Sequence, residues 1–189
     1  MRSMLMQCLS GIAAAAAILS FAVAVADEPE KNGLRLTDIV PADSSVLEST
    51  TGEPIDSSWL REAASDRVLL VTFWTQGCYN CTNTMPWLRK VQEKFGEKRF
   101  MVIGIHSPEF QYEHDLQRVA AAIKKYQLNY PSVVDNDFSI WRTFGNRAWP
   151  TSYLVASDGT VRYSAAGEIH PGDERAGRFE RKIEKLLQP

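Results

Sequence analysis

The stretch VLLVTFW at residues 68–74 is followed by the motif Cys78-Tyr79-Asn80-Cys81, and together these two features decide the fold. A continuous apolar run of this length is typical of a central strand that is covered on both faces. A Cys-x-x-Cys motif on the first turn of the next helix builds a redox dithiol, because the helix N-terminus stabilises a thiolate. The sequence therefore predicts a reactive pair of thiols at the end of a buried strand.

The only other cysteine, Cys8, lies in an N-terminal segment with the features of an export signal. Arg2 supplies a positive charge, residues 9–25 are almost entirely apolar, and the small residues at 24–26 suit a signal peptidase. We therefore expect residues 1–26 to be a cleaved signal peptide and the mature protein to be periplasmic or otherwise exported. The alternative is a retained membrane anchor, because the apolar stretch is marginally long enough to span a bilayer.

The remaining sequence has the length and charge of one globular domain. The chain has 189 residues, so the part after the signal is long enough to bury a core without disulfide staples. Residues 27–43 mix charge, proline and glycine without periodicity and are interpreted as a flexible lead-in, followed by one domain at residues 44–189. The formal net charge is −2 with both signs interspersed, so neither nucleic acid nor an anionic membrane surface is indicated as a partner.

Strands and helices alternate along this domain. The hydrophobic pattern predicts strands at residues 45–47, 68–74, 100–105, 132–134, 151–156 and 161–164. It predicts helices at residues 57–64, from the cysteine motif to Phe95, and at 114–126, 138–144 and 179–187. Residues 51–54 are interpreted as a turn. This alternation indicates an α/β domain.

Several motifs resemble the thioredoxin fold and, more narrowly, its exported TlpA/ResA-like branch. The general resemblance is carried by FWTxxCxxC at residues 73–81, by Met85-Pro86, and by Trp149-Pro150-Thr151 before a strand. The resemblance to the C-terminal thioredoxin-like domain of DipZ-type proteins is carried by residues 104–110, 135–137, 146–150 and 167–168. The resemblance implies an α/β thioredoxin-like three-layer sandwich, in which helices flank a central mixed β-sheet of about four or five strands.

The resemblance also implies a thiol-disulfide oxidoreductase, and no cofactor is expected. Cys78, at the mouth of the helix, is predicted to be the nucleophile, because the thiolate is the attacking species. Cys81, one turn further in, is predicted to resolve the mixed disulfide. Half of a zinc site is the alternative; His106, His114 and His170 could supply ligands, but no second cysteine pair exists.

The segment Trp149-Pro150-Thr151 resembles the loop that carries a cis-proline beside the dithiol in this family. Cis bonds are costly except before proline, so such a loop is kept where a backbone edge faces a partner. By this resemblance Pro150 belongs to the catalytic site. Trp149, beside it, is a candidate for substrate contact, together with Tyr79 and Asn80 between the cysteines.

Two positions depart from the family. Thioredoxins carry a buried Asp six residues before the first cysteine, where this chain has Thr72, and many ResA-like proteins carry a Glu six residues after it, where this chain has Thr84. The usual proton shuttles are therefore missing. Glu109 and Glu168, in motifs that resemble DipZ-type loops, are the candidates to replace them; the alternative for either is a solvated loop carboxylate. Gly77 replaces a residue that is often bulky, which should leave Cys78 more open.

Three functions compete. The first is an exported thiol-disulfide oxidoreductase that exchanges its dithiol with protein thiols and disulfides. The second is a thiol peroxidase, since Thr75-x-x-Cys78 is similar to the peroxiredoxin pattern, although Val71 occupies the place of its proline. The third is a copper-binding module of the SCO kind that uses the two cysteines and a histidine such as His170, but that family separates its cysteines by one residue more. The first is favoured.

The direction of electron flow does not follow from the motif, because the redox potential depends on thiolate stabilisation and local hydrogen bonds. By resemblance we expect a reductant that receives electrons from a CcdA/DsbD-type membrane donor.

Overall fold

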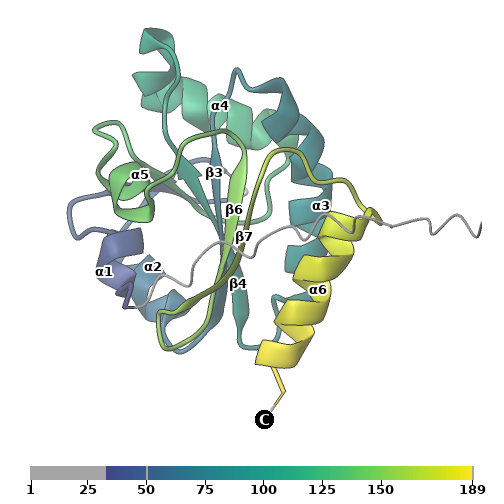
Figure 1. The fold of residues 1–189 in the computed structure, drawn as a ribbon. Coiled ribbons are helices and arrows are strands. Elements are labelled where there is room, and N and C mark those ends of the chain that lie inside the picture. The colour runs from purple at the N-terminus through teal and green to yellow at the C-terminus, as the bar shows by residue number, and fades with distance from the viewer. Residues whose placement is uncertain (1–32, 50, 189) are drawn as a thin grey trace, which may run out of the picture.

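One mixed β-sheet runs through the computed structural model, which describes residues 33–49 and 51–188 (Figure 1). Its strands lie in the order β2-β1-β5-β4-β3-β6-β7. Their bounds are β1 (Ser45–Leu47), β2 (Pro54–Ile55), β3 (Val68–Trp74), β4 (Phe100–His106), β5 (Ser132–Val134), β6 (Thr151–Val155) and β7 (Val161–Ala166). Strand β3 is parallel to β4 and antiparallel to β6, so the sheet is mixed, as predicted.

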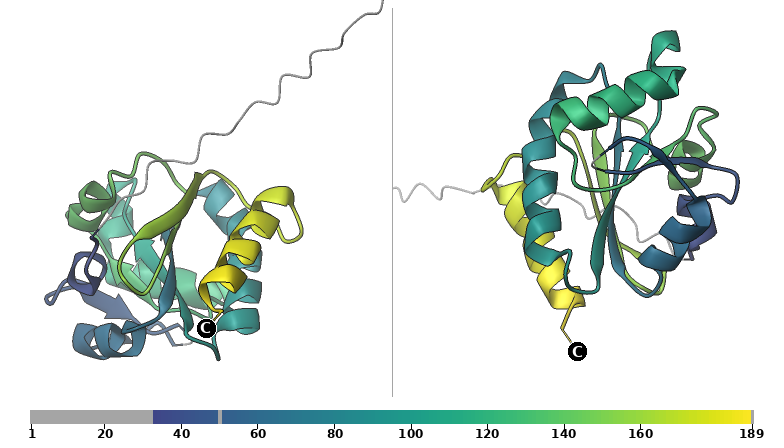
Figure 2. Two further views of the ribbon diagram at one scale, coloured as in Figure 1. Left: turned by 60° about the horizontal axis from the view of Figure 1, so that its bottom comes forward. Right: turned by 180° about the vertical axis from the view of Figure 1, so that it is seen from behind.

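Helices cover both faces of the sheet (Figures 1 and 2). The helices are α1 (Leu36–Ile39), α2 (Ser57–Ala64), α3 (Tyr79–Phe95), the 3₁₀-helix η1 (Gln111–His114), α4 (Leu116–Tyr126), α5 (Ser139–Phe144) and α6 (Glu174–Leu186). Buried residues of α3, α4 and α6 form one hydrophobic core with the sheet, and those of α1, α2 and α5 form the other. The predicted three-layer α/β sandwich is confirmed.

Strand β3 separates the two cores. All seven of its residues are buried. Leu70 and Trp74 pack into the core with α3, whereas Leu69, Val71 and Phe73 pack into the core with α2 and α5. Because successive side chains of a strand point to opposite faces, a strand covered on both sides is apolar at nearly every position, as β3 is at all but Thr72. This double burial holds the strand rigidly, and its carboxyl end carries the cysteine motif.

Several element bounds differ from the sequence predictions. The sheet has seven strands in the described residues, against the four or five implied by resemblance. Pro54, predicted in a turn, belongs to strand β2, which pairs with β1. Helix α6 begins at Glu174 rather than at 179, because the Asp173 side chain caps it by accepting the Ala176 N–H at 2.6 Å.

The prediction of a flexible lead-in at residues 27–43 is wrong for its last part. Helix α1 lies within it, and Ile39 and Val40 are 1% and 0% exposed. The Leu34 N–H donates to the Gly159 carbonyl at 3.2 Å, which anchors this segment beside the β6–β7 turn. The predicted signal peptide at residues 1–26 lies outside the described residues. Within the described part of the chain, no helix is long and apolar enough to cross a membrane.

Candidate active site

The two cysteines meet at the point where β3 ends and α3 begins. Cys78 is the N-cap of α3, and Cys78 and Cys81 form a disulfide with their Cα atoms 5.2 Å apart. The Cys78 Sγ also accepts the Cys81 N–H at 3.1 Å. Cys78 is half-buried and Cys81 is buried at 2% exposure. A sulfur at the N-terminus of a 17-residue helix is placed where a thiolate is stabilised, and it is the more accessible of the two.

The Trp149–Pro150 loop leads into β6, next to the end of β3 that precedes the dithiol. The Trp149–Pro150 peptide bond is cis. Thr151, the next residue, pairs with Phe73 in the antiparallel β3–β6 ladder, so the loop lies opposite the end of β3. The Pro150 carbonyl accepts the Gly167 N–H at 2.7 Å. The half-buried Trp149 ring packs against Trp141, with the ring centroids 4.3 Å apart.

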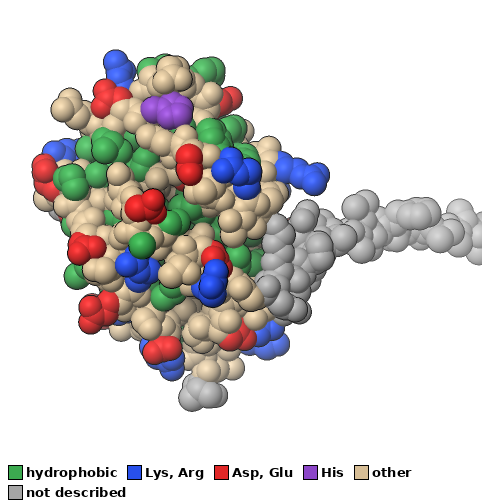
Figure 3. Space-filling model, turned by 90° about the vertical axis from the view of Figure 1, so that its left-hand side faces the viewer, with side chains coloured by type: hydrophobic (Ala, Val, Ile, Leu, Met, Phe, Trp, Pro, Cys, Tyr) green, Lys and Arg blue, Asp and Glu red, His purple; other side chains and the backbone are tan. Residues whose placement is uncertain are grey.

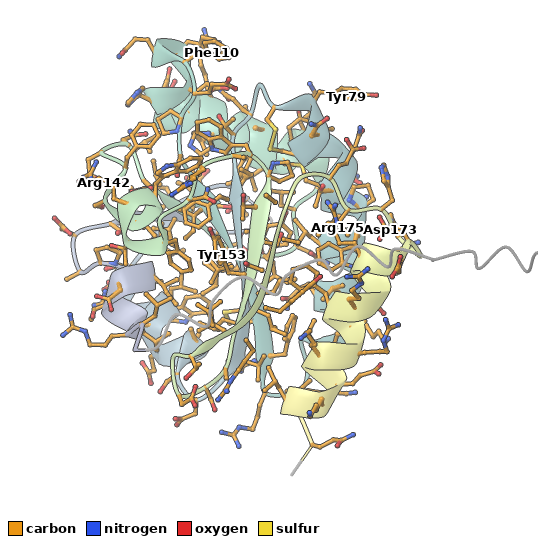
Figure 4. The ribbon with its side chains drawn as sticks, in the orientation of Figure 1. Tyr79, Phe110, Arg142, Tyr153, Asp173 and Arg175 are labelled. Atoms are coloured by element: carbon orange, nitrogen blue, oxygen red, sulfur yellow. A yellow bond between two sulfur atoms is a disulfide. The ribbon has the colours of Figure 1, made fainter. Side chains whose placement is uncertain are left out.

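The two residues between the cysteines face solvent. Tyr79 is 77% exposed, and it lies at the same end of the molecule as Phe110, which is 49% exposed (Figure 4). Asn80 is exposed, and its carbonyl accepts the Thr84 hydroxyl at 3.0 Å. Tyr79 is therefore available to a partner, while the Asn80 backbone is held by α3.

Threonines occupy both positions where the family carries carboxylates. Thr72 is buried, and its hydroxyl is 3.1 Å from that of Ser152 on β6. Thr84 is also buried, and its hydroxyl accepts the Ile169 N–H at 3.1 Å in addition to donating to Asn80. Thr84 thus ties the loop after β7 to the first turns of α3.

Glu168 lies in this tied loop. Its Oε1 accepts the Asn83 side-chain N–H at 2.8 Å and lies 2.7 Å from His170 Nε2. Asn83 stands two residues after Cys81 on α3. The side chain of Glu168 is 25% exposed, so solvent protons reach it. The structure therefore brings this carboxylate to the helix that carries the dithiol.

Glu109 is placed differently from Glu168. Its side chain is exposed, and its backbone N–H donates to Glu113 at 2.6 Å. The buried carboxylate of this region is Glu113, at 0% exposure, and the sequence analysis did not single it out. Its Oε1 accepts the N–H of Gly77, the residue before Cys78, at 2.8 Å.

His106 lies below the site, at the end of β4. It is 0% exposed, and its ring packs edge-on against Trp74, with the ring centroids 4.9 Å apart. Neither ring nitrogen has a hydrogen-bond partner among the described residues. Burial lowers the pKa of His106 to about 4, against the smaller opposing effect of the Glu113 charge. His106 is therefore neutral at pH 7.

Asp135 holds the loops on the other side of β4. Its Oδ2 accepts the Ser107 hydroxyl and the Trp141 N–H, each at 2.9 Å, and its Oδ1 accepts the Ile140 N–H at 3.0 Å. Burial raises the pKa of Asp135 in spite of these bonds.

Among residues 33–49 and 51–188, no three His, Cys, Asp or Glu side chains are grouped so that they could hold a metal ion.

A family model described as the AhpC/TSA family matches residues 40–164. The chain belongs to the AhpC/TSA family. Its match covers the sheet from β1 into β7, the dithiol and the cis-proline loop.

Individual relatives are similar to this AhpC/TSA protein over part of their own length. It is 34% identical over 134 residues (71% of this chain, 12% of the relative) to Protein SUPPRESSOR OF QUENCHING 1, chloroplastic, of Arabidopsis thaliana. It is 33% identical over 122 residues (65% and 17%) to Protein DipZ of Mycobacterium bovis. It is 29% identical over 100 residues (53% and 55%) to thiol-disulfide oxidoreductase ResA of Bacillus thuringiensis. The chain spans less than a fifth of the first two relatives.

Solved structures share the fold of this AhpC/TSA protein. A thiol:disulfide interchange protein of the thioredoxin family from Chlorobium tepidum superposes with a TM-score of 0.58 at 21% identity, covering 79% of this chain and 97% of that one. The predicted thioredoxin-like, TlpA/ResA-like and DipZ-like character is confirmed.

Proposed function

We propose that this protein is an exported thiol-disulfide oxidoreductase that uses Cys78 and Cys81 to reduce disulfides of protein partners. One observation carries the proposal: the two cysteines form a disulfide at the N-terminus of α3, with Cys78 more accessible than Cys81. A helix N-terminus favours the thiolate at the sulfur that partners can reach. Because Cys81 is buried, partners do not reach it, and it reacts only with the sulfur of Cys78.

In the reducing direction, the Cys78 thiolate attacks one sulfur of the partner disulfide and forms a mixed disulfide, and the other partner sulfur leaves as a thiolate. Cys81, after losing its proton, then attacks the Cys78 sulfur. The Cys78–Cys81 disulfide forms and the bond to the partner breaks. Two electrons pass to the partner, whose two sulfurs become thiols after taking up two protons. The oxidised protein must then be reduced again by a dithiol donor, for which we propose a CcdA/DsbD-type membrane protein.

Glu168 is the carboxylate that we propose as the proton acceptor for Cys81, directly or through water. Its support is its place beside α3, bonded to Asn83, and its partial exposure to solvent. His170, at 2.7 Å from Glu168, is positioned to pass the proton onward. Glu109 is the weaker candidate, because its side chain is exposed and it contacts Glu113 through its backbone N–H rather than its carboxylate.

Glu168→Gln should slow release of the mixed disulfide about tenfold, because the amide accepts no proton, and should change the pH dependence of release. Alkylation of Cys78 should stay within about twofold, since that step needs only the Cys78 thiolate. Stopped-flow release of a thiol from a preformed mixed disulfide, measured across pH, gives the profile. Glu174→Gln, an exposed change of the same kind on α6, is the control. An unchanged profile in Glu168→Gln, in Glu109→Gln and in the double variant would mean that solvent takes the proton.

Partners are proposed to meet the end of the molecule that carries the dithiol. Tyr79 is fully available there, Trp149 lines the cis-proline loop, and Asn80 offers its exposed side chain. On the face seen in Figure 3, acidic and basic side chains are interspersed, so that face offers no single-sign patch for a nucleic acid. The partners are therefore proposed to be polypeptides with accessible cysteines or disulfides.

Three cheap assays separate this proposal from its alternatives. The reduced protein should reduce insulin disulfides in the presence of dithiothreitol, consume peroxide no faster than a free thiol, and bind no stoichiometric copper. A thiol peroxidase is the second candidate, because the AhpC/TSA description applies to the matched family model. Val71, at the position of the peroxiredoxin proline, lies inside β3 and pairs with Ile103 and Tyr153. Fast peroxide consumption that fails in Cys78→Ser would favour the peroxidase.

A further inference from the structure

The Glu113 carboxylate joins two loops beside the dithiol. Its Oε1 accepts the Gly77 N–H at 2.8 Å, and its Oε2 accepts the N–H groups of Glu109 and Phe110 at 2.6 and 3.0 Å. Gly77 directly precedes Cys78, whereas Glu109 and Phe110 belong to the connection from β4 to η1. Hydrogen bonds from N–H groups to an ionised carboxylate are stronger than neutral ones. This buried side chain therefore fixes the two loops relative to each other.

Gly77 leaves the space that this contact needs. A Cβ atom at position 77 would lie 2.7 Å from Glu113 Oε1 and 3.0 Å from the Tyr112 hydroxyl oxygen. A side chain there would force the Glu113 carboxylate to shift, so glycine at position 77 permits this close approach. The space that a bulky residue would take before Cys78 is therefore occupied by Glu113 and Tyr112 from the loop after β4.

Glu113 is ionised at neutral pH. Burial raises its pKa, but the nearby Thr75 hydroxyl and the backbone N–H groups of Phe110, Glu109 and Gly77 outweigh burial, so the pKa lies below its usual value. His106, the imidazole on β4, is neutral near pH 7 and supplies no compensating charge. Other titratable groups in this region are Tyr112 and His114 on η1, and Arg118, Lys125 and Tyr126 of α4, of which Tyr112 and the three α4 residues line one pocket with Gly77. Glu168 and His170 from the loop before α6 lie beside α3.

We propose that Glu113 is a positioning residue for the redox couple, holding the turn before Cys78 and keeping a negative charge one residue from the attacking sulfur. The inference rests on the proposed function, in which this couple exchanges electrons. A fixed turn keeps the two sulfurs at a separation that favours ring closure. The negative charge disfavours the Cys78 thiolate of the reduced form. Both effects favour the disulfide, and so make the dithiol a stronger reductant.

The equilibrium with glutathione measures this preference. One protein disulfide and two glutathione thiols give one protein dithiol and one glutathione disulfide, so two electrons move. In Glu113→Gln the amide has one acceptor oxygen and no charge, so it can bond either Gly77 or the Glu109–Phe110 pair. We expect the equilibrium to move about tenfold toward the dithiol, or about 30 mV. Alkylation of Cys78 at pH 6 should become at least about threefold faster.

The measurement uses the full chain with Cys8→Ser, so that only the active pair is counted by acid quenching and alkylation. Gly77→Ala is the second variant: it keeps the carboxylate but displaces it, and should move the equilibrium in the same direction by about threefold. Glu97→Gln is the charge-matched control, because Glu97 is exposed and precedes β4 at its other end. It should leave the equilibrium within about twofold of wild type.

The role of Glu113 would be overturned by an equilibrium that stays within about twofold of wild type in both site variants, or by one that moves toward the disulfide. An equal shift in Glu97→Gln would reduce the effect to net charge and would also overturn it. A wild-type pair that does not equilibrate with glutathione would instead overturn the proposed function. The two failures are therefore distinguishable.

Discussion

Cys81→Ser should accumulate mixed disulfides with partner proteins, at least about tenfold above the level of Cys78→Ser. Cys78 keeps its place at the helix N-terminus in the first variant and attacks partners, but no second thiol releases them. In the second variant the remaining Cys81 is 2% exposed and meets few partners. Expression of the full chain in a periplasm, acid quenching, alkylation and a non-reducing gel measure the trapped species.

The double variant Cys78→Ser/Cys81→Ser sets the background for this comparison. Addition of dithiothreitol should release every trapped species, since only disulfide bonds hold them. Equal trapping by the two single variants would show that burial does not divide the roles of the cysteines. More trapping by Cys78→Ser would reverse the assignment of nucleophile and resolving thiol.

The central elements of the fold could be predicted from the sequence because both cores impose their pattern on it. Strand β3 is apolar at every position but Thr72, and α3 shows helical spacing up to Phe95. Strand β2 was missed because Pro54–Ile55 spans two residues, too few for any periodicity, and its existence depends on pairing with β1. The start of α6 was missed because its first turn is mostly polar, and only the Asp173 cap marks it.

The site residues that could be predicted are those that belong to one short stretch of sequence. The cysteine motif after an apolar run, and the tryptophan–proline pair before another strand, are such signals. Glu113 meets Gly77 across 36 residues of sequence, so its role depends on how β3 and β4 pair. The only hint was glycine at a position that is often bulky. The sequence analysis therefore named Glu109, which contributes only a backbone N–H to this contact, and missed Glu113, whose carboxylate accepts the hydrogen bonds.

The pH dependence of stability should be dominated in mildly acidic solution by His106. Its pKa is 6.5 when unfolded and about 4 when folded, so between these values the unfolded chain binds a proton that the folded chain excludes. Stability therefore rises with pH across this window and falls as pH drops from 6.5 to 4, by about 3 kcal/mol for this group alone. As the pH falls further, protonation of Glu113, whose pKa is lowered in the folded protein, also reduces stability. Asp135, whose pKa is raised in the folded protein, has the opposite effect and adds stability as the pH falls.

His106→Phe isolates the histidine contribution, because a phenyl ring keeps the edge-on contact with Trp74 and has no nitrogen to protonate. Urea unfolding of the oxidised protein at several pH values should give a variant whose free energy of unfolding falls about 3 kcal/mol less than wild type between pH 7 and 4. His170→Gln is the control, since that side chain is 56% exposed. Parallel pH profiles for wild type and His106→Phe would mean that the folded protein accommodates a protonated His106, with Glu113 as the nearest counter-charge.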